Sequence, residues 1–183
     1  MAKIDPYGME IATIEKMVDI NRKTILEIGC GSGRITEKLN TPSNSILAID
    51  LDKDDIVAAR NKVPGVVFLP IGFDSFDCDH RIFDLGIFSL SLHHFGNITK
   101  MHNALSRAKR LCGKLLVIEP ALDSPITLLA NLFVPEHEWL QEAQEALGYL
   151  CRKHRQSSEH RLEIEWHFDS LTEFCAYFLT KPD

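Results

Sequence analysis

A glycine-rich segment, LEIGCGSGRIT at residues 26–36, constrains the fold of this chain more than any other part of the sequence. It follows an apolar run that predicts a strand, Thr24–Ile28, and it opens a predicted helix, Gly33–Leu39. Glycine permits a tight turn and a close approach of backbone to ligand, and a helix N-terminus presents free N–H groups. This strand–loop–helix order therefore predicts a nucleotide-type binding loop in an α/β fold.

The spacing of the glycines narrows the class of ligand. They stand at Gly29, Gly31 and Gly33, whereas the dinucleotide pattern needs its third glycine where this chain has Arg34. No Gly-Lys-Ser/Thr follows, so the segment is not a P-loop. Glu27 would repel a pyrophosphate and suits a ligand that carries an ammonium or sulfonium group. The alternative, a purely structural turn, is less favoured.

Short apolar runs alternate with helical patterns from residue 24 to residue 120. The further strands are predicted at Ile46–Asp50, Val66–Leu69, Phe83–Phe88 and Lys114–Glu119, and the further helices at Asp52–Lys62 and Asn97–Leu111. This alternation predicts an α/β fold with a Rossmann-like, doubly wound, mostly parallel sheet that carries helices on both faces.

The flanking segments predict a cover for this core. Helices are expected at Pro6–Asp19, Ser124–Phe133 and Pro135–Leu147, a half-exposed strand at Leu162–Phe168, and a final helix that starts at Ser170 and runs to about Leu179. We therefore expect one domain over residues 1–183, with a helical cover at 1–23, a cofactor-binding core at 24–120, and a helical cover, late strand and final helix at 121–183. One late strand implies an abbreviated C-terminal sheet edge, which would favour a homodimer.

A second acidic position supports the loop. Asp50 ends the next predicted strand, 23 residues after Glu27. A carboxylate there is placed to accept hydrogen bonds from ribose hydroxyls. Asp52 is expected to cap the following helix instead.

These motifs resemble those of the class I S-adenosylmethionine-dependent methyltransferases. LEIGCGSGRIT is similar to their motif I, and AIDLDKDDIVAAR to their second strand and its helix. FDLGIFSLSLHHF resembles the fourth strand, and LSRAKRLCGKLLVIEP the helix, turn and fifth strand. The resemblance covers about residues 24–120 in the right order, and it implies S-adenosyl-L-methionine as the cofactor and S-adenosyl-L-homocysteine as its product.

The resemblance also implies which residues hold the cofactor. Asp50 would hold the ribose and Leu51 would lie against the adenine. Where the family often has an acidic residue for the adenine amino group, this chain has Phe73, so either Asp74 takes that role or the adenine stacks near Phe73. The remaining residues assigned to the cofactor site are Glu27, Gly29, Cys30, Gly31, Gly33 and Ser89.

Two adjacent histidines are the candidates for catalysis. His93 and His94 follow the fourth predicted strand, at the carboxyl edge where open α/β sheets bind ligands. One of them would act as a general base for the acceptor, or the pair would only orient the loop. Glu119 ends the fifth strand at the same edge, where it would bind a substrate or hydrogen-bond a loop. The other histidines show no ligand-like spacing, so no metal site is predicted.

The composition favours a small or medium organic acceptor. The net charge is −6, which disfavours a nucleic-acid partner because such binding depends on Lys and Arg. A nucleic-acid or protein methyltransferase, the cofactor-binding subunit of one, and a non-catalytic cofactor-binding module stay open as alternatives. Five cysteines without a CxxC pair indicate a cytoplasmic protein, and no segment predicts a signal peptide or a membrane partner.

Overall fold

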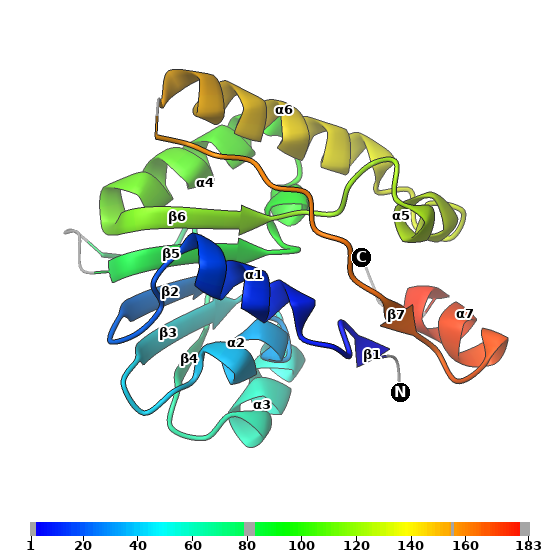
Figure 1. The fold of residues 1–183 in the computed structure, drawn as a ribbon, viewed down its shortest axis with the longest axis horizontal. Coiled ribbons are helices and arrows are strands. Elements are labelled where there is room, and N and C mark those ends of the chain that lie inside the picture. Colours follow the sequence, from blue (N-terminus) through cyan, green and yellow to red (C-terminus); the bar gives the residue numbers. More distant parts are fainter. Residues whose placement is uncertain (1–2, 79–82, 155, 180–183) are drawn as a thin grey trace.

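A parallel sheet forms the centre of the computed structural model, which describes residues 3–78, 83–154 and 156–179 (Figure 1). Its five strands lie in the order β4-β3-β2-β5-β6, and every neighbouring pair is parallel. The strands are β2 (Thr24–Ile28), β3 (Ser45–Asp50), β4 (Val67–Pro70), β5 (Phe83–Ser89) and β6 (Cys112–Ile118). The strand order reverses between β2 and β5, so the loops after these strands frame the crevice where open α/β sheets bind ligands.

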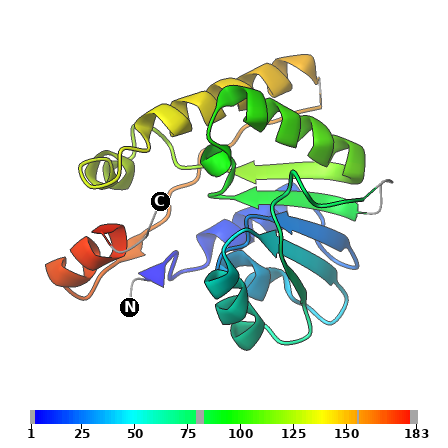
Figure 2. The same cartoon turned by 180° about the vertical axis from the view of Figure 1, so that it is seen from behind.

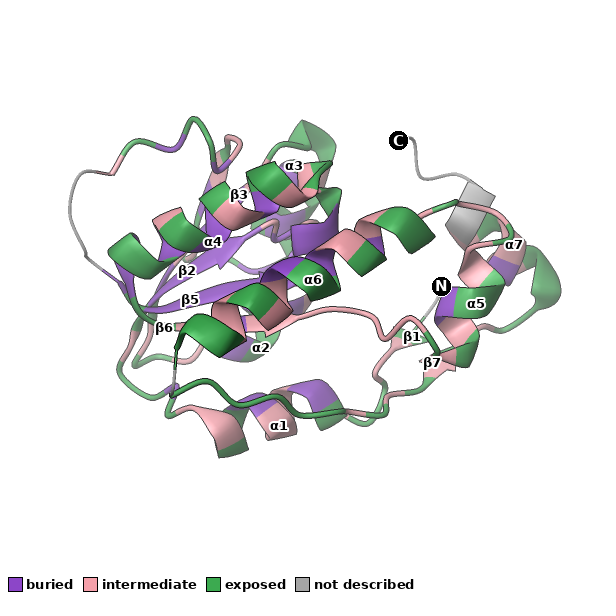
Figure 3. Cartoon of the chain, turned by 90° about the horizontal axis from the view of Figure 1, so that it is seen from above, coloured by how far each residue is buried: buried purple, intermediate pink, exposed green. Residues whose placement is uncertain are grey.

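Helices cover both faces of this sheet, as the sequence predicts. One core cluster joins the sheet to α1 (Met9–Met17), α2 (Arg34–Leu39) and α3 (Lys53–Lys62). The other joins it to α4 (Ile98–Leu111) and α6 (His137–Lys153). Figure 2 shows α4 from the side opposite to α1, and Figure 3 shows that the central strands β2 and β5 are largely buried while the helices expose their outer faces. The predicted Rossmann-like α/β fold is confirmed.

Local sequence explains where the helices begin. The Asp52 carboxylate accepts hydrogen bonds from the N–H groups of Asp54 and Asp55, at 2.8 and 3.1 Å, and so caps α3 as predicted. The Asn97 side chain caps α4 by accepting from the N–H of Lys100. The apolar stripe of α4 is buried against the sheet and consists of Met101, Ala104, Leu105, Ala108 and Leu111.

The C-terminal region differs from the expectation. The predicted strand Leu162–Phe168 is wrong in extent: only β7 (Trp166–His167) is a strand, and it pairs antiparallel with β1 (Lys3–Ile4) outside the main sheet. Alternating side chains at 162–168 gave a strand pattern, but no part of this segment pairs with β6 to extend the main sheet. Within the described residues, the main sheet therefore ends at β6.

The remaining helices lie around this small strand pair and the carboxyl edge. They are η1 (Leu92–Phe95), α5 (Pro125–Ala130) and α7 (Leu171–Leu179). α6 runs six residues beyond its predicted end at Leu147. Over the described ranges, no helix is both long and apolar enough to cross a membrane.

Candidate cofactor-binding and active site

The glycine loop lies between β2 and α2 and is held against the end of β3. The N–H groups of Gly29 and Cys30 both donate to the carbonyl of Ile49, at 2.9 and 3.1 Å. Gly29, Gly31 and Gly33 have φ values of 73°, 49° and 80°, a region that side chains rarely adopt. A Cβ on Gly29 would lie 2.5 Å from the Cβ of Ser91, so this position also requires the small residue for space.

Asp50 is fixed beside this loop. One of its carboxylate oxygens accepts from the N–H of Gly31 at 2.7 Å, and the other accepts from the N–H of Asp52 at 2.9 Å. The side chain is only partly buried, so its carboxylate oxygens keep lone pairs for a further donor. The structure thus brings the glycine loop and the Asp50 carboxylate together, as the sequence predicts. The contact of Asp50 with a ribose stays a prediction.

The two predicted adenine contacts lie in different environments. Leu51 follows β3 with 77% of its surface exposed, and it lies against Gly72, where a Cβ would approach its Cδ2 to 2.9 Å. Phe73 is 4% exposed and packs in the core against Phe76 and Phe88. The expectation that adenine stacks near Phe73 is therefore not supported, because this ring already belongs to the core.

Asp74, the other residue assigned to the adenine, lies on the surface of the same loop. Its side chain is exposed, and its carbonyl accepts from the Arg107 guanidinium at 2.9 Å. The same Arg107 lies over the ring of Phe73, 5.2 Å from its centroid. Arg107 therefore fixes the loop that carries both residues, and the role of Asp74 stays a prediction.

Glu27 lies behind the glycine loop and is 2% exposed. Its carboxylate accepts a hydrogen bond from the Thr36 hydroxyl of α2 at 2.6 Å. Burial raises the pKa of Glu27 to about 7, against the hydrogen bond from Thr36 and the charge of Arg34, which both lower it. Glu27 thus ties β2 to α2, and its predicted contact with a cationic ligand stays a prediction.

Replacing Glu27 with glutamine is expected to stabilise the protein at alkaline pH. The unfolded chain loses this proton near pH 4.5, whereas the folded chain keeps it to about pH 7. Between these values only the folded state holds the proton, so the free energy of unfolding of the wild type falls as pH rises. Glu27→Gln removes that loss and should gain on the order of 2–3 kcal/mol relative to wild type between pH 5 and pH 8. Urea unfolding at pH 5 and pH 8 measures the free energy of unfolding of both proteins, and the exposed Glu15→Gln serves as the control variant. If Glu27→Gln differs from wild type by the same free energy at both pH values, the prediction is contradicted.

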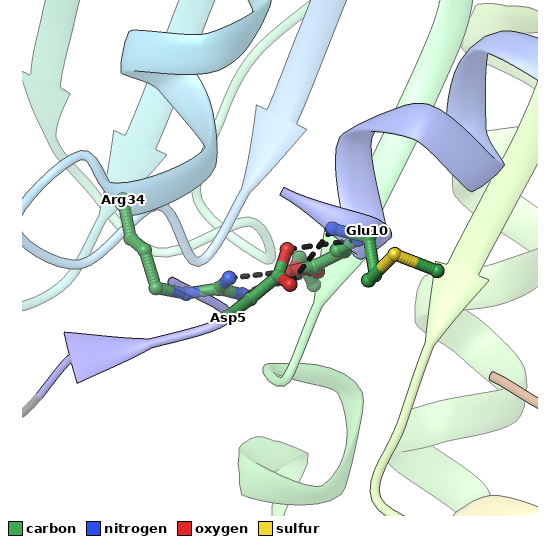
Figure 4. A network of polar contacts seen from close by, with 5 residues as sticks. Asp5, Glu10 and Arg34 are labelled. Carbon is green, nitrogen blue, oxygen red and sulfur yellow. Dashed lines mark hydrogen bonds and ion pairs between the residues drawn. The ribbon is translucent and has the colours of Figure 1, made fainter. Parts of the chain in front are cut away.

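Ser89 belongs to a polar network that the sequence did not reveal, and Figure 4 labels Asp5, Glu10 and Arg34 of this network. The Arg34 guanidinium pairs with the buried carboxylate of Glu10 and donates to the Ser89 hydroxyl at 2.8 Å, while that hydroxyl donates to Glu10 at 2.9 Å. The Asp5 carboxylate accepts from the N–H groups of Met9 and Glu10, both at 2.8 Å, and so fixes the start of α1. This network attaches the N-terminal helix to the glycine loop. The sequence gives no sign of it, because Glu10 and Ser89 lie 79 residues apart.

The turn that carries the two histidines packs directly on the glycine loop. The Ser91 hydroxyl donates to the carbonyl of Ile28 at 2.7 Å. One oxygen of Glu119 accepts from the N–H groups of Ser91 and Leu92, at 3.2 and 2.8 Å, and the other contacts Nδ1 of His93. Of the two roles considered for Glu119, the structure thus shows the loop-bracing one.

The two histidines differ in exposure. His93 is buried, and His94 is exposed, with the two rings 4.0 Å apart. Both lie at the carboxyl edge of the sheet, where the sequence places them. Their action as a general base stays a prediction.

Known proteins that resemble this chain are methyltransferases. Residues 25–114 match a family described as a methyltransferase domain. The chain is 24% identical over 127 residues to a putative methyltransferase, 235L, of Invertebrate iridescent virus 6, across 68% of this chain and 48% of that protein. It is 38% identical over 58 residues to the ubiquinone biosynthesis O-methyltransferase of Hydrogenovibrio crunogenus, across 32% of this chain and 23% of that protein.

A solved structure shows the same fold over most of its length. It is a SAM-dependent methyltransferase from Aquifex aeolicus, with a TM-score of 0.61, 17% sequence identity, and coverage of 81% of this chain and 82% of that one. The chain spans less than half the length of the two curated relatives.

Proposed function

The chain carries a class I S-adenosylmethionine-dependent methyltransferase domain over residues 25–114, and we propose that it transfers a methyl group from this cofactor to a small or medium organic acceptor. In this proposal residues 24–120 form the cofactor-binding core, and residues 1–23 and 121–183 cover it. The bound cofactor would supply a methyl group already activated on a sulfonium, so the protein needs chiefly to position the acceptor and exclude water.

The arrangement of Asp50 and Leu51 beside the glycine loop carries the proposal. The Asp50 carboxylate accepts a hydrogen bond from the Gly31 N–H at 2.7 Å, and its remaining lone pairs can accept from ribose hydroxyls. Leu51 offers an exposed apolar side chain directly after it, which suits the face of an adenine. Glycines with positive φ let the backbone between them approach a ligand closely. These residues fit a nucleoside with a short uncharged or cationic extension better than one with a pyrophosphate.

The proposal of a small acceptor is supported by charge and by a relative. The net charge of −6 gives no general attraction for a phosphate backbone. The Hydrogenovibrio crunogenus relative is named as an O-methyltransferase of ubiquinone biosynthesis, and this name supports the proposal of an organic acceptor.

Turnover with labelled cofactor tests the acceptor class. The full chain is incubated with methyl-labelled S-adenosylmethionine and a panel of small hydroxyl, amine and carboxylate compounds, with duplex DNA and a mixture of unfolded proteins as comparisons. Label is expected in at least one small-molecule class at a rate 10-fold or more above both macromolecules. Faster labelling of DNA or protein would contradict the proposed acceptor.

A further inference from the structure

A third ligand-type side chain lies beside the two histidines. Glu136 stands at the N-terminus of α6, which packs on η1. One potential ligand atom each from His93, His94 and Glu136 lies within 4.8 Å of the other two. The three side chains come from segments 42 residues apart, and the packing of α6 on η1 brings them together.

The contact of His93 with Glu119 engages one ring nitrogen and leaves the other one able to bind a ligand. Its side chain is 4% exposed, and its Nδ1 contacts the carboxylate of Glu119, whose side chain is 5% exposed. A neutral imidazole that donates Nδ1–H to a carboxylate leaves Nε2 with a free lone pair. This carboxylate–histidine pair is the support that metal-bound histidines have in proteins, because it fixes the tautomer and the ring orientation.

Glu119 is itself held rigidly in this arrangement. Its second oxygen accepts from the N–H groups of Ser91 and Leu92, so the carboxylate cannot rotate without losing two backbone hydrogen bonds. The brace thus extends from the backbone of the turn through Glu119 to the ring of His93.

The carboxylate of Glu136 has no competing structural role. It stands at the N-cap of α6 without a side-chain capping hydrogen bond. Across residues 3–78, 83–154 and 156–179, its side chain makes no hydrogen bond or ion pair. The oxygen lone pairs of this carboxylate are therefore available to a ligand.

We propose that His93, His94 and Glu136 bind a divalent first-row metal ion beside the glycine loop, with Glu119 as the residue that positions His93. Two imidazoles and one carboxylate form a ligand set that suits Zn²⁺ and neighbouring ions. Tetrahedral Zn²⁺ with bonds of about 2.1 Å separates its ligand atoms by roughly 3.4 Å, so a small rotamer adjustment closes the observed spread.

The position of this site gives the ion a role in the reaction. Ser91, two residues before His93, contacts the backbone of Ile28 at the start of the glycine loop. Three protein ligands leave a coordination position open, and an ion there polarises an oxygen that binds it. Resting on the proposed function, the inference is that the open position takes a hydroxyl oxygen of the methyl acceptor; the ion site itself stands on the geometry alone.

Titration of the metal-free full chain with Co²⁺ tests the site, because the visible absorption of bound Co²⁺ reports its coordination. We expect one equivalent to bind wild type with visible bands and without the thiolate charge-transfer band that binding to the five cysteines would give. Glu136→Gln and His94→Ala should each weaken binding at least 10-fold. His94 is exposed and Glu136 is only partly buried, so these variants are expected to fold.

Two matched variants and one independent titration separate the possible outcomes. Glu138→Gln removes a neighbouring exposed carboxylate from the same helix start, and His160→Ala removes an exposed histidine; both should bind Co²⁺ like wild type. Equal Co²⁺ affinity in wild type, Glu136→Gln and His94→Ala would overturn the metal site. Binding of S-adenosylhomocysteine is measured on the same samples. A wild-type chain that binds Co²⁺ but does not bind S-adenosylhomocysteine would refute the proposed function and leave the metal site in place.

Discussion

Replacing Gly29 with alanine is expected to lower the free energy of unfolding by about 3 kcal/mol or more and to abolish S-adenosylhomocysteine binding. The added Cβ would lie 2.5 Å from the Cβ of Ser91 and 3.0 Å from its hydroxyl. Ser91 cannot retreat easily, because that hydroxyl donates to the carbonyl of Ile28 and its N–H donates to Glu119. The clash therefore separates the glycine loop from the histidine turn, which are the two walls of the site.

The matched control for this substitution is Gly65→Ala. Gly65 has a φ of 89°, so alanine there bears a similar backbone strain, but its Cβ would meet nothing within 4 Å. It should cost only about 1–2 kcal/mol and leave ligand binding unchanged. Urea unfolding and calorimetry measure both variants. A Gly29→Ala protein as stable as Gly65→Ala, with normal binding, would show that the close packing of loop on turn is not required.

Replacing Asp50 with alanine should weaken S-adenosylhomocysteine binding about 100-fold or more. Hydrogen bonds to a charged group contribute about 1.5–3 kcal/mol each, and the proposed ribose contact would lose its acceptor. The substitution also removes the partner of the Gly31 N–H, so the loop loses one of its fixed points.

The control variant Asp52→Ala separates a loss of stability from a loss of ligand binding, because it also removes a carboxylate beside the end of β3. The Asp52 carboxylate caps α3, and its backbone N–H donates to the Asp50 carboxylate at the end of β3. Its replacement should cost about 1 kcal/mol of stability and leave the dissociation constant within twofold of wild type. If Asp50→Ala binds as tightly as Asp52→Ala, the ribose contact is wrongly assigned.

The central fold was predictable because its signals are local. β2 was predicted to the residue, since a run of apolar side chains between polar ends is typical of a strand buried on both faces. Asp52 and Asn97 begin their helices as predicted, because a cap needs only the side chain and the next few N–H groups. Gly29 follows β2 and Asp50 ends β3, so both were expected at the same edge of the sheet because these strands are parallel neighbours.

What the sequence did not reveal depends on contacts between distant segments. The ion pair of Glu10 and Arg34 forms only when α1 packs over the loop, and the approach of Glu136 to the histidines needs α6 to fold onto η1. Phe73 was assigned to the ligand because of its place in a motif, but an aromatic side chain in such a loop can equally turn into the core, as it does here. Burial of this kind is decided by packing, which spacing does not encode.

The most direct test of this account is a calorimetric titration of the folded wild-type chain with S-adenosylhomocysteine, with NAD as the comparison ligand. The glycine loop, the partly exposed Asp50 carboxylate and the exposed Leu51 predict a dissociation constant in the micromolar range for the sulfur nucleotide. We expect at least 100-fold weaker binding of NAD, because the Asp50 carboxylate beside the loop would repel its pyrophosphate. Binding of NAD with equal or greater affinity, or no binding of S-adenosylhomocysteine, would contradict the account.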